Sequence, residues 1–185
     1  ICVSIIDSQP FNNFQEEKDG EYYGDKNYSN YSNDYTTSSI REWLNEDFYN
    51  ITFSNAEKAK LVATTLDNSG YDSANNKYNY SESIDNVFLL SYDDMCNEAY
   101  GFNLDRVTED EDRIAIGTDY AKCQGLNVNG NNSIDEDKQY FGNSYYWLRT
   151  AGHEASFWSC ITTYAGTVSW AGNVSSTYIG IRPAV

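Results

Sequence analysis

The sequence predicts an α+β fold in which short helices precede an antiparallel sheet. Capped apolar stripes with helical spacing lie between residues 39 and 101, and short aromatic-rich segments separated by Gly or Asn fill residues 145–182. Polar loops rich in Asn, Ser, Asp and Gly connect these segments. A length of 185 residues is typical of one domain, so residues 1–185 are predicted to form a single domain with a hydrophobic core.

The chain begins with an apolar run, residues 1–6, which predicts a strand. The polar stretch over residues 11–37 predicts a long surface loop. Because the chain has no initiating methionine and no signal peptide, we expect it to be a mature or trimmed part of a longer protein.

A helix is predicted directly after this loop. Ser39 and Glu42 match the capping-box pattern, which satisfies free amide groups at a helix start. An apolar stripe with helical spacing follows, made of Ile40, Trp43, Leu44 and Phe48. We therefore expect the helix to bury this face, with Trp43 in the core.

Three shorter elements follow before the sheet. A second capping box, Ser54 with Glu57, opens a short helix. The apolar run 87–90 predicts a buried strand, and Ser91 with Asp94 forms a third cap that opens another helix. These elements alternate with polar segments that we interpret as solvated loops and one solvated charge run, namely 67–83, 105–113 and 124–139.

The C-terminal third predicts the sheet. Its four segments alternate with turns and are typical of an antiparallel meander, with strands at 145–149, 155–161, 166–170 and 178–182. Arg149 and Arg182 lie beside apolar strand residues, so we expect each to form a buried ion pair with a carboxylate such as Asp119.

The charge balance excludes two classes of partner. There are 28 acidic against 12 basic residues, a formal net charge of −16. Nucleic acids and anionic membrane surfaces attract clustered Lys and Arg, so neither is expected to bind this chain. No apolar run approaches the roughly 20 residues of a membrane span, so membrane insertion is not expected either.

The spacing of the cysteines indicates the cellular compartment in which the protein is found. Cys2, Cys96, Cys123 and Cys160 are widely spaced and form no C-x-x-C pair, which argues against a zinc ribbon or a thioredoxin-type motif. An even number of such cysteines fits an oxidising, extracellular or cell-surface setting. Three disulfide patterns are open, of which Cys96–Cys123 with Cys2–Cys160 is favoured; the alternative is four buried free thiols.

Sugar binding is the sharpest functional hypothesis from the residues. Tyr and Asn are abundant, and carbohydrate sites stack an aromatic ring on the sugar and surround it with polar side chains. The expected ligand-binding residues lie on the C-terminal strands and turns: Trp158, Tyr164, Trp170, Asn173 and Tyr178. The competing interpretation places at least one of the two tryptophans in the core.

A calcium site is the second hypothesis. Acidic, Asn-rich loops supply the oxygen ligands that Ca²⁺ prefers. The expected ligands are Asn129, Asn131, Asp135 and Asp137. Asn132 and Lys138 stand where an EF-hand has Gly and Glu, so a standard EF-hand is rejected. A second candidate is the loop with Asp67, Asn68 and Asp72; the alternative for both is a solvated turn.

Catalysis has little support in the sequence. His153 is the single histidine and lies beside Glu154 in a predicted turn. No G-x-S-x-G, Walker or G-x-G-x-x-G motif is present, and acidic pairs arise by chance among 28 acids. We therefore expect a protein that is not an enzyme, with a hydrolase as the weakest alternative.

Six ordered motifs resemble an uncharacterised domain family of secreted and cell-surface proteins of gut anaerobic bacteria. They are Ser39–Asn45, Phe53–Lys58, Val87–Ser91, Thr118–Ala121, Trp147–Thr150 and Gly180–Ala184. The last strands are also distantly similar to the C-type-lectin-like fold in its formylglycine-generating-enzyme branch. That resemblance implies two or three short helices packed on a twisted antiparallel sheet, with long irregular loops that present a binding surface.

Two departures from these relatives matter. An extra N-terminal strand that carries a Trp is missing, so the resemblance implies a sheet completed from outside the chain. Only Cys160 lies in the last third, so the cysteine-pair oxidase activity does not carry over. The sequence thus predicts an extracellular, non-catalytic binding module for a glycan or a surface protein. The alternative is a structural subunit of a surface assembly whose sheet a neighbouring domain or subunit completes.

Overall fold

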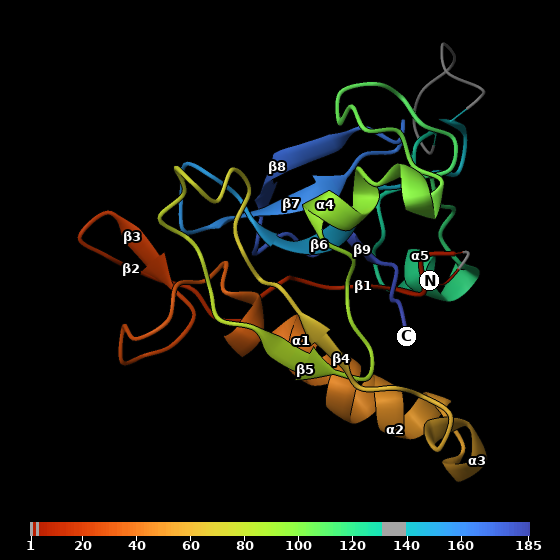
Figure 1. Ribbon diagram of the computed structural model, residues 1–185, viewed down its shortest axis with the longest axis horizontal. Helices are drawn as coiled ribbons and strands as arrows, with labels where there is room; N and C mark the ends of the chain where they lie inside the picture. Colours follow the sequence, from red (N-terminus) through yellow and green to blue (C-terminus); the bar gives the residue numbers. More distant parts are fainter. Residues whose placement is uncertain (1, 3, 131–139) are drawn as a thin grey trace.

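The computed structural model describes residues 2, 4–130 and 140–185 and shows an α+β fold, as predicted (Figure 1). Its main sheet has five strands in the order β1-β9-β6-β7-β8. In that order the strands are β1 (Asp7–Ser8), β9 (Gly180–Ile181), β6 (Tyr146–Ala151), β7 (Trp158–Thr162) and β8 (Val168–Asn173).

The predicted meander is confirmed for three strands. β6, β7 and β8 are successive antiparallel neighbours. The fourth predicted strand does not follow β8: β9 lies on the other side of β6, parallel to it, and pairs antiparallel with β1. The two ends of the chain therefore meet in the sheet, where the Ile6 amide donates to the Ile181 carbonyl at 2.9 Å. This pairing joins residues far apart in sequence, so local patterns do not reveal it.

The first helix is one continuous run of three pieces: α1 (Ser39–Trp43), a π-helical turn η2 (Leu44–Phe48) and α2 (Tyr49–Thr52). The N-cap is Ser38 and not Ser39, because the Ser38 hydroxyl accepts from the Arg41 amide. Ile40 and Leu44 are fully buried, as predicted. Trp43 is half-buried and only packs against the edge of the core.

Two of the predicted capping boxes are present. Ser54 with Glu57 caps α3 (Asn55–Lys58), and Ser91 with Asp94 caps α4 (Tyr92–Met95). α3 ends at Lys58, whereas its sequence predicts a helix that continues to about Val62. Further short helices among the described residues are η1 (Tyr35–Thr37), η3 (Glu98–Tyr100) and α5 (Asp119–Cys123).

Two predictions about the first half of the chain are wrong. Residues 11–37 are not a surface loop: they hold a hairpin, and Phe11 and Tyr35 within them are fully buried. Residues 87–90 form only an isolated bridge from Phe88 to Ala184, although Val87 and Leu89 are buried. The two small sheets pair β2 (Glu16–Lys18) with β3 (Glu21–Tyr23), and β4 (Thr64–Leu66) with β5 (Ser83–Asp85).

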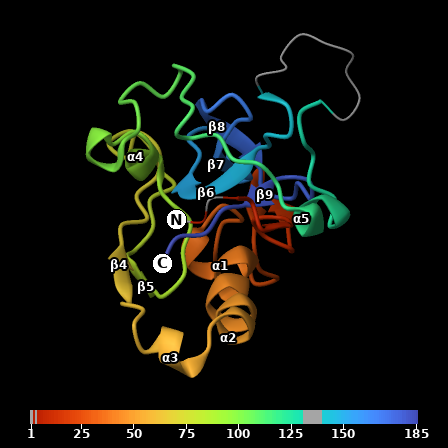
Figure 2. The same cartoon turned by 90° about the vertical axis from the view of Figure 1, so that its right-hand side faces the viewer.

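The core has two parts, one on each face of the main sheet. Successive residues of a strand point to opposite faces, and along β6 Trp147 enters one cluster while Tyr146 and Leu148 enter the other. The first cluster packs under α1 and η2; the second receives Met95 of α4 and Ala121 of α5. In Figure 2, α1 lies below the main sheet, and α4 and α5 lie to its left and right. All six residues of β6 are consequently buried.

Candidate binding site

A cavity of about 440 Å³ opens between the loop that follows β4 and the start of α4. We call it the Tyr71 pocket. Aromatic rings, carboxylates and hydroxyls line it together, a mixture typical of small-ligand sites. The lining residues used below are Asp67, Tyr71, Asp72, Tyr92, Asp93 and Thr150.

The loop is fixed to the main sheet by its backbone. The Tyr71 amide donates to the Ala151 carbonyl of β6 at 2.9 Å. The Asn76 side-chain amide donates to the carbonyls of Tyr71 at 2.8 Å and Gly152 at 3.1 Å. A side chain at Gly70 would meet the Tyr78 carbonyl at 2.4 Å, so only glycine fits the close approach. These contacts hold the Tyr71 ring in place against the sheet.

Arg149 of β6 connects the elements that line the pocket. Its guanidinium pairs with the Asp94 carboxylate of α4 at 2.7 Å and donates to the Leu89 carbonyl at 2.8 Å. Its Nε donates to the Asp67 carbonyl at 3.2 Å. One buried arginine thus joins sheet, helix and loop, which are the three walls of the pocket.

The prediction that Asp119 pairs with Arg149 and Arg182 is wrong. Arg149 pairs with Asp94, while Asp119 is exposed on α5 and pairs with Lys122 at 3.3 Å. Arg182 donates to the backbone carbonyls of Cys2 and Arg113 at 3.0 Å and to the Tyr146 hydroxyl at 3.0 Å. Burial beside a strand predicts that an arginine has partners, but not that the partner is a carboxylate.

Aromatic rings continue the wall outward from Tyr71. The ring of Tyr92 meets it edge-on with centroids 4.9 Å apart, and the ring of Trp170 stacks on it at 5.4 Å and an interplanar angle of 11°. The Arg106 guanidinium lies 4.3 Å from the Trp170 centroid and 5.8 Å from that of Tyr71, a cation–π arrangement. The Tyr71 ring is therefore held from several sides.

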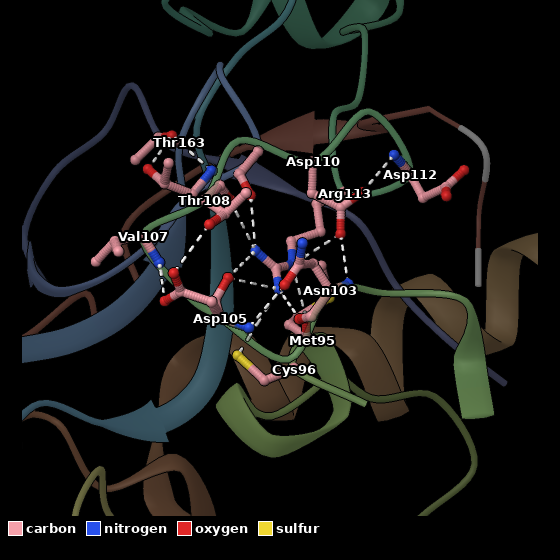
Figure 3. A network of polar contacts seen from close by, with 12 residues as sticks. Met95, Cys96, Asn103, Asp105, Val107, Thr108, Asp110, Asp112, Arg113 and Thr163 are labelled. Carbon is pink, nitrogen blue, oxygen red and sulfur yellow. Dashed lines mark hydrogen bonds and ion pairs between the residues drawn. The ribbon is translucent and has the colours of Figure 1, made fainter. Parts of the chain in front are cut away.

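Arg113 anchors the loop that carries Arg106. Its side chain is fully buried, with Asp110 as its ion-pair partner at 3.4 Å. Figure 3 shows the guanidinium among the backbone carbonyls of Met95, Asn103, Asp105 and Thr108, to which it donates. It also donates to the Gly166 carbonyl at 3.2 Å. The interpretation of 105–113 as a solvated face is thus wrong at Arg113, which the sequence reasoning missed.

The carboxylates give the pocket a negative potential. Desolvation raises the pKa of Asp93, the carboxylates of Asp67 and Asp94 raise it further, and Arg149 opposes the shift. The Asp67 carboxylate accepts from the Ser69 amide at 2.8 Å and the Asp72 carboxylate from the Asn75 side chain at 3.0 Å. Carboxylates have four lone-pair sites, so both retain capacity for a ligand hydroxyl.

The five sequence-predicted ligand residues do not form one site. The ring of Trp170 stacks on that of Tyr71, but Trp170 is not among the residues that line the Tyr71 pocket. Trp158 and Asn173 are cross-strand partners of β7 and β8, with the Trp158 ring packed on Phe157. Tyr164 packs on Tyr145, with ring centroids 5.5 Å apart. Desolvation raises the pKa of Tyr145, and the proximity of Tyr164 and Tyr178 raises it further, so Tyr178 lies near the same ring. The predicted aromatics are therefore divided among three places.

The predicted metal ligands fall largely outside the described residues, namely Asn131, Asp135 and Asp137. Asn129 is described, and its side-chain amide donates to the Tyr140 carbonyl at 3.4 Å. Within residues 2, 4–130 and 140–185, no group of three or more His, Cys, Asp or Glu side chains is placed to hold a metal ion. Calcium binding stays a prediction.

The four cysteines are free thiols in the structure, and neither favoured disulfide is formed. Cys160 is fully buried in the second core cluster, where burial raises the pKa of its thiol, and Cys96 packs against that cluster. Cys123 is exposed, and Cys2 is half-buried, at a site where its carbonyl accepts from Arg182.

Sequence reasoning missed Tyr71, Tyr92 and Asp93 as site residues. The sequence did indicate part of this site, because the loop with Asp67 and Asp72 was a second candidate for calcium binding. The third carboxylate comes from α4, and only the contact between that helix and β6 brings it to the loop. The Tyr92 amide donates to the Thr150 hydroxyl at 2.8 Å, and this contact was not visible in the sequence.

A family model for a domain of unknown function, DUF6273, matches residues 12–185. The chain belongs to the DUF6273 family. The expectation of an uncharacterised domain family is thereby confirmed, and the DUF6273 match includes every residue of the Tyr71 pocket. We found no match among curated proteins or solved structures. Among the described residues, no helix is long and apolar enough to cross a membrane.

Proposed function

We propose that this DUF6273 domain is an extracellular, non-catalytic binding module that recognises a neutral glycan at the Tyr71 pocket. One observation carries the proposal: the rings of Tyr71 and Tyr92 and the carboxylates of Asp67, Asp72 and Asp93 line the same cavity. Aromatic rings favour the apolar faces of sugars, and carboxylates accept hydrogen bonds from their hydroxyl groups. Both needs of a sugar ring are met within one cavity.

The fixed geometry of the pocket supports binding. Tyr71 is held by the backbone of β6 and by contacts with Tyr92, Trp170 and Arg106, so little side-chain entropy remains to be lost when a ligand binds. Arg149 fixes the position of Asp67 relative to α4. A preorganised polar site is costly to build and is typical of places where a protein binds a ligand.

The charge of the pocket selects the class of glycan. Three carboxylates line it, and the whole chain carries a net charge of −16. Sialylated, sulfated or uronic-acid sugars would bring like charges into a partly desolvated site, which costs free energy. Neutral or amino sugars avoid that repulsion.

The proposal places the domain among C-type-lectin-like folds of secreted or cell-surface proteins of gut anaerobic bacteria. Short helices on a curled, antiparallel-rich sheet and the loop-borne pocket are compatible with that placement. The six sequence motifs are the main support for it. A search for the parent protein's signal peptide or anchor would test the location.

The test is a glycan array probed with the wild-type chain and matched variants. Tyr92→Ala and Asp93→Asn change the pocket, while Tyr178→Ala and Asp119→Asn make the same changes at exposed positions elsewhere. We expect saturable binding to neutral glycans, weakened at least about tenfold by the two pocket variants and unchanged in the two controls.

Each array is run in Ca²⁺ and in EDTA, because one predicted calcium site lies on a separate loop, and the second candidate loop contributes Asp67 and Asp72 to the pocket. Circular dichroism confirms that all variants fold. Binding that both pocket variants retain, or a folded protein that binds only acidic glycans, would contradict the proposal.

A further inference from the structure

A second cavity, of about 330 Å³, lies at the β1 edge of the main sheet, on the side away from β8. We call it the edge groove. The helical run α1–η2–α2 and β1 form its walls, and Tyr120 of α5 borders it. Its lining includes Ile6, Asp7, Trp43, Asp47, Phe48 and Ile51.

The edge groove exposes apolar surface. Ile51 is 85% exposed and Tyr120 is 61% exposed, and both border a cavity that also contains the half-buried rings of Trp43 and Phe48. These two rings contact each other with centroids 5.3 Å apart and 33° between their planes. Adjacent exposed apolar side chains around a hollow mark a contact surface more often than single exposed residues do.

Asp7 gives the groove a second property. Its carboxylate is half-buried and accepts one hydrogen bond, from the Ser8 amide at 2.7 Å. In the part of the chain that the structure describes, no Lys or Arg pairs with it. Asp47 is a second carboxylate of the groove, and the lining contains no basic side chain. A partly desolvated carboxylate without a cation is costly, and a bound cation would remove that cost.

We propose that the edge groove binds a Lys or Arg side chain flanked by apolar residues, presented by a short segment of a partner protein. The aliphatic stem of such a side chain would lie on Trp43 and Phe48, and its charged end would reach Asp7 and Asp47. A cavity of about 330 Å³ accommodates one long side chain and its neighbours rather than a folded domain.

The charge of the chain decides between this occupant and a second copy. Each copy carries a net charge of −16, so two copies meeting at a groove that is itself acidic repel each other. A basic segment is attracted instead, and the attraction weakens as salt is added. The occupant is therefore a basic, apolar segment of another protein.

The probe is a five-residue peptide, acetyl-Ala-Leu-Lys-Leu-Ala-amide, compared with the same peptide carrying norleucine in place of Lys. Titration of the folded chain is followed by NMR at the indole N–H of Trp43. We expect saturable shifts with the Lys peptide and at least about tenfold weaker binding of the norleucine peptide. Asp7→Asn, which preserves shape, should lower the affinity for the Lys peptide several-fold.

Four further variants keep the test decisive. Asp47→Asn changes an exposed groove carboxylate and should also weaken binding, whereas Asp119→Asn should not. Tyr92→Ala should leave peptide binding intact, which separates this proposal from the glycan site. Equal binding of both peptides, or unchanged binding in folded Asp7→Asn, would overturn the proposal. So would dimerisation in sedimentation experiments that Ile51→Ser abolishes.

Discussion

At the scale of single residues, three buried arginines do much of the positioning. Arg149 joins the walls of the Tyr71 pocket, Arg182 ties the last strand to Cys2 and Tyr146, and Arg113 holds the loop with Arg106. Arg113 donates mainly to backbone carbonyls, which leave no trace in the sequence. Because Arg113 lies in a run of charged residues, the sequence predicted that it would be solvated. In the structure its side chain is fully buried.

Arg113→Met should destabilise the domain by about 2–4 kcal/mol, because it leaves several buried carbonyls without a donor. Urea unfolding measures the loss. Arg106→Met is the matched control: it removes a half-buried guanidinium that lies on Trp170, and should cost about 0.5–1 kcal/mol. If Arg113→Met unfolds at the same urea concentration as the wild type, the hydrogen bonds from Arg113 to the carbonyls contribute nothing to stability.

Asp7 gives a prediction about pH. Desolvation raises the pKa of its carboxyl above the ordinary value, against the hydrogen bond from Ser8. A group whose pKa is raised on folding contributes stability at low pH that is lost as pH rises through the folded-state pKa. Asp7→Asn should therefore raise the Tm at pH 7, by about 1–2 °C, and leave it unchanged near pH 3.

The groove neighbours of Asp7 that ionise are Asp47 and Tyr120, and both are present in the variant. Differential scanning calorimetry at the two pH values makes the comparison. A gain in stability with a loss of peptide affinity would show that Asp7 is kept for binding at the expense of stability. A lower Tm at pH 7 would instead mean that the carboxylate stabilises the fold.

At the scale of elements, capping predicts helix starts better than helix lengths. The boxes at Ser54 and Ser91 are confirmed because both partners are local in sequence. The ends of helices and the place of β9 depend on distant contacts, such as that of β9 with β1, and were not predicted. The prediction of a surface loop over residues 11–37 was wrong for the same reason, because Phe11 and Tyr35 are buried by other parts of the fold.

The two capping boxes make a matched pair for testing the role of α4. Ser91→Ala and Ser54→Ala each remove an N-cap and should each cost about 1 kcal/mol in helix stability. α4 carries Tyr92 and Asp93, whereas α3 carries no residue of the Tyr71 pocket. We expect only Ser91→Ala to weaken glycan binding, measured by titration of both variants at equal fraction folded. Equal binding would show that the start of α4 does not shape the pocket.

At the scale of the whole molecule, one sheet separates two core clusters and carries two candidate surfaces. The Tyr71 pocket lies where the loop after β4 meets α4 and β6, and the edge groove lies beside β1. The sequence predicted the α+β class and three strands of the sheet from periodicity and turn residues. It did not predict which loops converge, so the site was expected on the C-terminal aromatics and not at Tyr71.

The decisive experiment locates the bound glycan on the chain. A neutral glycan identified on the array is titrated into the isotopically labelled chain, and amide shifts are mapped by NMR. We predict shifts concentrated in residues 67–74, at Tyr92 and Asp93, and at Thr150. Shifts confined to the region of Tyr164 and Tyr178, or to the edge groove, would contradict the assignment of glycan binding to the Tyr71 pocket.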